Sequence, residues 1–269
     1  MENYELYYLI DLPTEIIQNL KLVSEEIDLQ SIDCYLNQLM DLKTAAAAYQ
    51  YFINLWKEDG DNIKMLYCQL ECARRAFDKY EEKHISPQIY KDTMKCFTRF
   101  LEECKKKNGR MFFDRGWWTY RQVSMNLFRL GELEYEYGEY KGEKVINIHI
   151  PSDADLSTEA VDCSLKQAAL FFHSYHDNYE YIPYTCYSWL MSPTLKSLLS
   201  EKSNILAFQN RFDIMEENKE DKEYIEWLFQ VPADTEYLKL PEKTSLQKKV
   251  KKLLLNGGTV GVAYGIMRL

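Results

Sequence analysis

The 269-residue sequence has little positive charge for its size. It carries 33 Lys and Arg against 42 Asp and Glu, which gives a formal net charge of −9. Proteins that bind nucleic acids or anionic membrane surfaces non-specifically rely on a basic field. The acidic balance therefore argues against nucleic-acid and membrane partners. We expect the short basic runs at 105–107 and 248–252 to be solvated helix faces.

Long apolar runs are also missing. No stretch reaches the roughly 20 residues that a membrane-spanning helix needs. The first residues, MENYELYYLIDLP, lack the basic start and the apolar core of a secretory signal. The seven cysteines are an odd number scattered along the chain, which is typical of reduced thiols rather than of a disulfide framework. These features predict a cytoplasmic globular protein.

The motifs of several enzyme classes are absent. The sequence contains no P-loop, no nucleophile elbow and no zinc signature. His173 and His176 are spaced i, i+3 on a predicted helix, but no third ligand is apparent, so we expect no metal site. The chain is nevertheless 46% hydrophobic and 14% aromatic, which supplies ample core and pocket surface.

The first 110 residues have the apolar spacing of helices. One helix is predicted after Pro13, and others at 31–57, from Ile63 onward and at 86–108. Ser86 followed by Pro87 is typical of a helix start, and Gly109 of a helix end. We therefore predict an all-helical N-terminal domain over residues 1–110.

Residues 111–269 read as a mixed α/β domain. Thr119 and Gln122 have capping-box spacing, which predicts a short helix after the Trp pair. From Leu130 the period drops to two, which predicts a strand with Glu132, Glu134 and Glu136 on one face. Further strands are predicted at 144–150, 182–190, 204–212 and 259–269, with helices at 157–175, 219–229 and 245–255. The first two of these strands flank a helix, so we expect them to be parallel.

The corner between the strand at 144–150 and its helix reads HIPSDADLSTEAV. Ligands often bind at such corners, and phosphates favour the free N–H groups of the helix start. This corner has no glycine and carries Asp153 and Asp155. We expect these carboxylates and Ser157 to cap their own helix and to repel an added anion. A cationic or amine ligand fits this corner better.

Several segments carry a resemblance to a known family, namely DRGWWTYRQVSMNLFRLGELEYE, HIP, CYSWLMSP, SNILAFQNRF and TSLQKKVKKLLLNGG. In this order they resemble the bacterial two-domain acyltransferases with a helical N-terminal domain and a GNAT-like C-terminal domain. The resemblance implies an α+β fold whose strands 144–150 and 182–190 form a splayed parallel pair. It also implies an acyl-CoA co-substrate lying in that splay. The chain lacks the glycines and the Arg of the usual GNAT phosphate loop.

The resemblance also implies roles for individual side chains. A direct acyl transfer to an amine needs a base, for which His149, Glu132 and Glu134 are candidates. It also needs an acid for the departing thiolate, for which Tyr187 and Tyr184 are candidates. Residues expected to contact the acyl-CoA or the acceptor are Ile148, Ile150, Cys186, Ser188, Trp189 and Ser157.

Less specific roles remain open for these residues. His149 can be an ordinary strand residue, the glutamates a solvated face, and the buried thiol of Cys186 part of the core rather than a nucleophile. The function is accordingly predicted as acyl-CoA-dependent N-acyl transfer to a small amine. The alternative is a non-catalytic module on the same fold that binds a small molecule or a protein.

Overall fold

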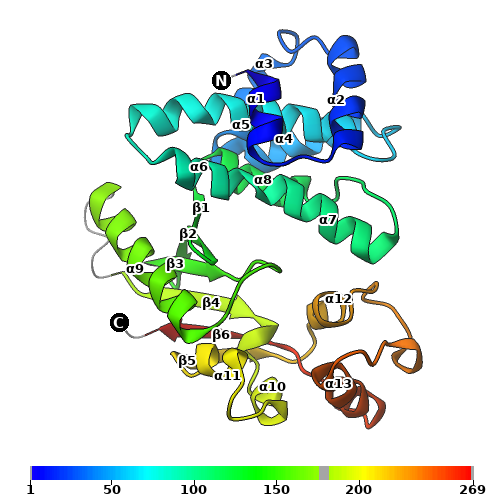
Figure 1. Ribbon diagram of the computed structural model, residues 1–269, viewed down its shortest axis with the longest axis vertical. Coiled ribbons are helices and arrows are strands. Elements are labelled where there is room, and N and C mark those ends of the chain that lie inside the picture. Colours follow the sequence, from blue (N-terminus) through cyan, green and yellow to red (C-terminus); the bar gives the residue numbers. More distant parts are fainter. Residues whose placement is uncertain (1, 176–181, 268–269) are drawn as a thin grey trace. The chain divides into compact units, whose positions relative to one another are not determined.

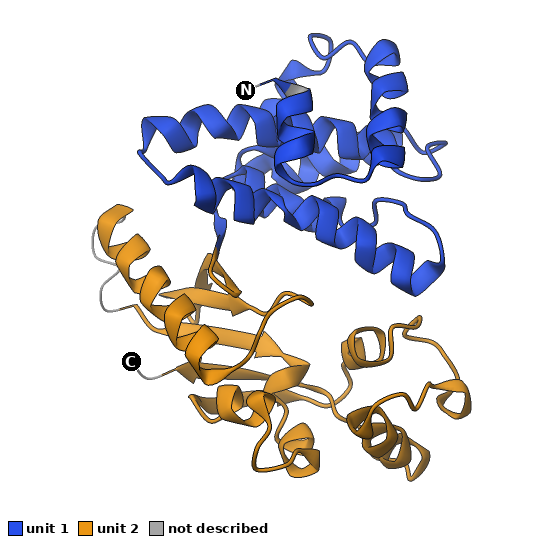
Figure 2. Cartoon of the chain, viewed as in Figure 1, with its two compact units in different colours: residues 1–129 blue, residues 130–269 orange. Residues whose placement is uncertain are grey.

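The computed structural model describes residues 2–175 and 182–267. The chain forms two compact units, residues 1–129 and 130–269, shown in different colours in Figure 2. The expected division between residues 110 and 111 lies earlier in the chain than this one. Residues 111–129 group with the first unit because helix α8 (Gly116–Val123) packs against the helices before it.

The first 110 residues are helical in the described part of the chain, as predicted. The helices are α1 (Asn3–Leu9), α2 (Thr14–Glu26), α3 (Asp33–Leu39), α4 (Leu42–Leu55), α5 (Ile63–Glu82), α6 (Pro87–Met94) and α7 (Cys96–Asn108). The predicted helix at 31–57 is divided, because the Asp41 side chain accepts a hydrogen bond from Lys43 N at 3.0 Å and starts α4. The helix predicted at 86–108 is divided at Lys95.

Helix α5 forms the centre of this unit. It contacts α1, α2, α3, α6 and α8, and most of its length is buried (Figure 1). Gln69 Nε2 donates to Gly116 O at 2.6 Å, and the Thr119 hydroxyl donates to the Gln69 side chain. The predicted capping role of Thr119 is therefore wrong, since this residue lies inside α8 and bonds across to α5.

The chain forms a six-stranded sheet with the order β1-β2-β3-β4-β6-β5, and its strands β2 to β6 belong to the second unit. Its strands are β1 (Leu127–Leu130), β2 (Leu133–Tyr140), β3 (Glu143–His149), β4 (Tyr184–Ser188), β5 (Phe212–Asn218) and β6 (Val262–Met267). β2 and β3 form the predicted antiparallel hairpin, and β3 and β4 are adjacent and parallel, as predicted. β6 pairs antiparallel with both β4 and β5.

The helices of this unit are α9 (Thr158–Tyr175), α10 (Pro193–Leu198), α11 (Asn204–Gln209), α12 (Glu223–Phe229) and α13 (Ser245–Leu255), with single turns η1 (Trp189–Met191) and η2 (Tyr237–Lys239). The strand predicted at 204–212 is wrong, because α11 and the start of β5 occupy it. Gln209 is buried there and donates to Ser192 O at 2.8 Å. A short apolar run does not distinguish a buried strand from a buried helical turn.

Helix α9 covers one face of the sheet (Figure 1). Phe172 packs edge-on against Tyr135 and Tyr137 of β2, at ring-centroid distances of 6.3 and 5.2 Å. Ser164 bonds both Leu130 O and the Tyr135 hydroxyl, at 2.5 and 2.9 Å. The predicted alternation of β2 is thus explained, since its tyrosine face is the core face under α9.

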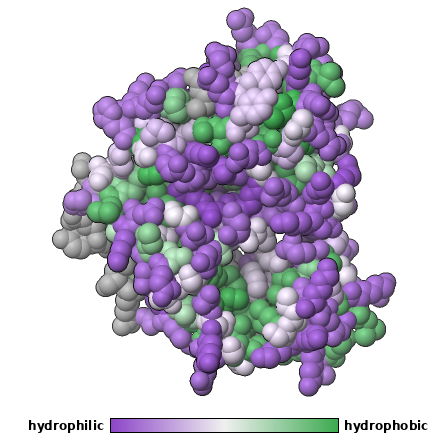
Figure 3. All heavy atoms as spheres, viewed as in Figure 1, coloured by the Kyte–Doolittle hydropathy of each residue, from purple (hydrophilic) through white to green (hydrophobic). Residues whose placement is uncertain are grey.

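The visible surface in Figure 3 is mostly hydrophilic, which fits a chain with 28% charged residues. Among the described residues, no helix has the length and apolar character needed to cross a bilayer.

Candidate functional site at the ends of the parallel strands

The two parallel strands separate before either of them ends. Their ladder joins Ile146 to Tyr184 and Asn147 to Thr185, whereas β3 runs on to His149 and β4 to Ser188. At the last joined pair, the buried Thr185 Oγ1 donates to Asn147 Oδ1 at 2.7 Å. This side-chain bond ties the strands together at the point from which they diverge.

A histidine and a glutamate meet on the face of the sheet opposite α9. In the hairpin register Glu134 lies opposite His149, and Glu136 opposite Asn147, so these four side chains share one face. His149 Nε2 lies 2.8 Å from Glu136 Oε2, with side-chain exposures of 25% and 13%. This contact orients the imidazole ring while leaving part of it accessible to solvent.

Glu136 was not a candidate in the sequence prediction. Alternation along β2 places it on the same face as Glu134, but only the register of the hairpin shows which of them contacts the histidine ring. The two other glutamates have different surroundings. Glu134 is buried, with 2% exposure, so the expectation of a solvated face is wrong for it.

Glu132 lies in the turn before β2 rather than on the strand face, and this part of the prediction is also wrong. Gly131 beside it has a φ of +70°, a backbone conformation that residues other than glycine rarely adopt, and it allows the sharp turn. Glu132 Oε2 accepts a hydrogen bond from Asp155 N at 2.9 Å. This carboxylate therefore supports the loop before α9.

The loop before α9 contains a carboxylate, that of Asp155, which accepts hydrogen bonds within the loop. Asp155 Oδ1 accepts from Ser157 N at 2.8 Å, and Asp155 Oδ2 accepts from the Ser157 hydroxyl at 2.9 Å. These two bonds lower the pKa of Asp155, the backbone bond most. Asp155 therefore bonds to Ser157, the residue directly before α9, while the expected capping of the helix by Asp153, Asp155 and Ser157 stays a prediction.

The side chains of β4 are buried from Tyr184 to Cys186 and become exposed toward the end of the strand. Tyr184 and Cys186 are buried, whereas Tyr187 is 52% exposed. Burial raises the pKa of Tyr184 to about 12, and its ring packs against Tyr135 and Phe172 beneath α9. Burial also raises the pKa of the Cys186 thiol, so the sulfur is held protonated. Tyr187 is the tyrosine of this strand that presents its ring to solvent.

The strand ends earlier than predicted, at Ser188, because its hydroxyl accepts from Leu190 N at 3.1 Å and starts the turn η1. Trp189 therefore belongs to this turn, and its backbone N donates to Glu223 Oε1 at 3.2 Å. Burial is the main cause that raises the pKa of Glu223. Glu223 is a residue that sequence reasoning missed, because α12 reads as an ordinary charged helix.

Tyr187 lies beside the start of α12. Burial and the carboxylates of Asp221 and Glu223 raise its pKa, while a hydrogen bond with Asn218 lowers it. Asp221 Oδ1 also accepts from Glu223 N at 2.9 Å. A hydroxyl and two carboxylates therefore gather at the carboxyl end of β4.

The remaining predicted residues lie along β3 and α9. Ile148 is buried on the core face, and Ile150 follows directly after the strand with partial exposure. Of the predicted histidine pair, His173 lies on α9, whereas His176 lies outside the described residues. Across residues 2–175 and 182–267, no group of three His, Cys, Asp or Glu side chains is arranged to hold a metal ion.

Comparisons with known proteins agree with this architecture. Residues 1–125 match the family model of the N-acyltransferase N-terminal domain, and residues 127–267 match that of the GNAT-like C-terminal domain. A comparison with curated protein sequences finds no match.

Several solved structures are similar to this chain. An acyltransferase in complex with decanoyl-CoA has 21% identity and a TM-score of 0.80, with 99% of this chain and 87% of that one covered. A mutant acyltransferase in complex with octanoyl-CoA has 18% identity and a TM-score of 0.80, again with 99% of this chain and 87% of that one covered. An acyltransferase in complex with decanoyl-CoA and teicoplanin has 18% identity and a TM-score of 0.74, with 100% of both chains covered. These likenesses show a shared fold, and with the family models they show that the chain belongs to the family that joins an N-acyltransferase N-terminal domain to a GNAT-like C-terminal domain.

Proposed function

We propose that this protein transfers an acyl group from an acyl-CoA to an amine. The observation that carries the proposal is the separation of β3 and β4 after Asn147 and Thr185, in a chain of this family. Beyond that point the strand edges are no longer joined, and an extended ligand with amide groups can hydrogen bond to such edges. The pantetheine arm of CoA has this character, and the similar structures with decanoyl-CoA and octanoyl-CoA support the choice of donor.

His149 is the base in this proposal. An amine must lose its extra proton before its nitrogen can attack the acyl carbonyl carbon. The contact of His149 Nε2 with Glu136 Oε2 orients the ring, so the other ring nitrogen is the one that takes the proton. Glu136 acts as a positioning residue, through the histidine.

Tyr187 is the acid. As the new N–C bond forms, the C–S bond of the thioester breaks and the CoA sulfur leaves as a thiolate. The hydroxyl of Tyr187 can donate a proton to it, because this ring is exposed at the end of β4. Tyr184 is less suited to the role, since its ring is buried under α9. Cys186 takes no covalent part, because burial holds its thiol protonated.

Charge at the strand ends favours an amine as the acceptor. Asp221 and Glu223 lie beside Tyr187 and attract a protonated amine to the end of β4. The carboxylate of Asp155 lies in the loop just before α9 and repels a phosphate, so we do not place the CoA pyrophosphate on that helix end. We also propose a cytoplasmic location, where acyl-CoA is available, which suits the seven free thiols of the chain.

The test is a thermal-shift screen of CoA, octanoyl-CoA and decanoyl-CoA, followed by turnover with a panel of primary amines. We expect acyl-CoA to stabilise the protein, and the release of CoA thiol to match the N-acyl amine formed. The acidic corner at Asp155 favours a second candidate, a binding module without catalysis. Stabilisation by amines, together with no stabilisation by any CoA ester, would support that candidate and contradict the transferase.

A further inference from the structure

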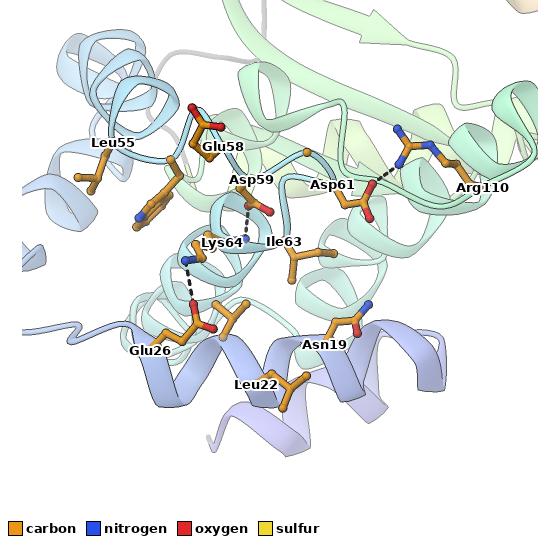
Figure 4. A pocket seen from close by; sticks show the side chains of 13 residues that line it. Asn19, Leu22, Glu26, Leu55, Glu58, Asp59, Asp61, Ile63, Lys64 and Arg110 are labelled. Carbon is orange, nitrogen blue, oxygen red and sulfur yellow. Dashed lines mark hydrogen bonds and ion pairs between the residues drawn. The ribbon is translucent and has the colours of Figure 1, made fainter.

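A cavity of about 710 Å³ lies within the first unit. It is formed by α2, the segment between α4 and α5, and Arg110 (Figure 4). Its volume falls in the range of small-molecule sites, roughly 300–1,000 Å³. The residues that line it take no part in the site at the strand ends.

Apolar side chains line the cavity from two different helices, and some of them are partly uncovered (Figure 4). Leu22 and Leu55 at its rim are 62% and 46% exposed, although they are large hydrophobic side chains. Trp56 lines the same cavity and stacks on Phe52 with ring centroids 4.9 Å apart. Exposed apolar side chains gathered around a cavity indicate surface that a ligand covers.

The polar lining is acidic overall. Glu26, Glu58, Asp59 and Asp61 face only two cationic side chains, Lys64 and Arg110. Both cations already have partners, as Figure 4 shows. Lys64 Nζ lies 2.8 Å from Glu26 Oε2, and Arg110 pairs with Asp61.

Negative charge therefore remains on the segment between the helices. Asp59 Oδ2 accepts a backbone bond from Lys64 N at 2.7 Å and shares the charge of Lys64 with Glu26, whereas within the described residues no ion pair reaches Glu58. These two carboxylates disfavour an anion and favour a cation in the cavity.

The segment that carries these carboxylates is held in place. Asn62 adopts a left-handed conformation with φ 53, and its Nδ2 donates to Phe113 O at 2.9 Å. Phe113 N in turn donates to Asp61 O at 3.0 Å. A wall fixed before the ligand arrives loses little conformational entropy on binding.

We propose that this cavity binds an organic cation with an apolar body, of the arylalkylamine class. The apolar body lies against Leu22, Leu55 and Trp56, and the ammonium group faces Glu58 and Asp59. An indole such as that of Trp56 also attracts a cation through its ring. This site is independent of acyl transfer and goes beyond it.

The test is isothermal titration calorimetry of the full chain with phenethylamine, in the absence of acyl-CoA. The anion 3-phenylpropionate has the same apolar body with the opposite charge, and we expect it to bind at least about tenfold more weakly, which is roughly 1.4 kcal/mol. Glu58→Gln should lower the affinity for phenethylamine about two- to fivefold, the range of an exposed ion pair. Leu22→Ser, an exposed change that spares the fold, should lower it as well.

Two controls make the result specific. Glu25→Gln removes an exposed carboxylate of α2 that does not line the cavity, and it should leave the affinity unchanged. Asp221→Asn weakens an amine site beside Tyr187 instead, so an affinity that falls with Asp221→Asn and not with Glu58→Gln would place phenethylamine there and overturn the proposal. Equal affinity for the two probes, equal losses with Glu58→Gln and Glu25→Gln, or no heat of binding would each overturn the proposal.

Discussion

Gly138 on β2 gives the most direct test of how the strand pair is held. A Cβ atom at this position would lie 3.1 Å from Asn147 Cγ and closer still to Asn147 Nδ2. Gly138→Ala therefore forces the Asn147 side chain to move. The Oδ1 atom of this side chain accepts a hydrogen bond from the Thr185 hydroxyl at 2.7 Å. The change should break the bond that joins β3 to β4 where they separate.

The expected magnitude follows from the burial of Thr185. A buried hydroxyl that loses its partner costs about 1–3 kcal/mol. Replacing glycine by alanine also restricts the unfolded chain, which opposes this loss by about 0.4–1 kcal/mol. We expect Gly138→Ala to lower the free energy of unfolding by about 1–2 kcal/mol, measured by urea denaturation.

Gly60→Ala is the matched control. No atom lies within 4 Å of a Cβ built at Gly60, so this variant should equal the wild type or exceed it slightly. In an Asn147→Ala background, the penalty of Gly138→Ala should largely disappear, because its partner is gone. Equal stability of Gly138→Ala and the wild type would refute the reasoning, as would an unchanged penalty in the Asn147→Ala background.

Three further predictions concern the chemistry and its pH dependence. Glu136→Gln should lower kcat roughly tenfold with little change in KM, because a charged hydrogen bond to His149 becomes neutral. The ¹⁵N chemical shifts of the His149 ring should also change, since they report its tautomer. An unchanged kcat contradicts the positioning role of Glu136. Cys186→Ala should retain most activity, and intact-mass analysis with acyl-CoA should find no acyl-enzyme; an adduct on Cys186 contradicts direct transfer. Glu223→Gln should gain stability relative to the wild type as pH rises above 4.5, because burial raises the pKa of this carboxyl and folding then opposes its ionisation. Urea denaturation at several pH values above 4.5 measures the stability of Glu223→Gln minus that of the wild type. A difference that falls as pH rises would contradict this prediction.

Much of the fold could be predicted from local patterns. The period-two run after Leu130 located β2, and the strand–helix–strand order around α9 predicted the parallel pair. Ser86 and Pro87 marked the start of α6, where the Ser86 side chain accepts from Gln88 N. These signals depend on residues near one another in the chain, so the sequence shows them without knowledge of the tertiary structure.

The parts that could not be predicted depend on contacts between distant segments. Glu136 and His149 meet because of the hairpin register, which alternation alone does not fix. Glu223 reaches the backbone of Trp189 from a helix 34 residues later in the chain. The short run at 204–209 is helical, and its buried Gln209 bonds to Ser192 O, a contact that the local apolar pattern does not contain.

The central claim is tested most directly by following CoA thiol release and the N-acyl amine together, with octanoyl-CoA and a panel of primary amines, for the wild type, His149→Ala and Tyr187→Phe. We expect equal amounts of both products with the wild type, and rates lowered roughly a hundredfold or more in each variant while octanoyl-CoA still binds. Wild-type rates in both variants would contradict the assigned roles. An absence of octanoyl-CoA binding to the wild type, by calorimetry, would contradict acyl transfer itself.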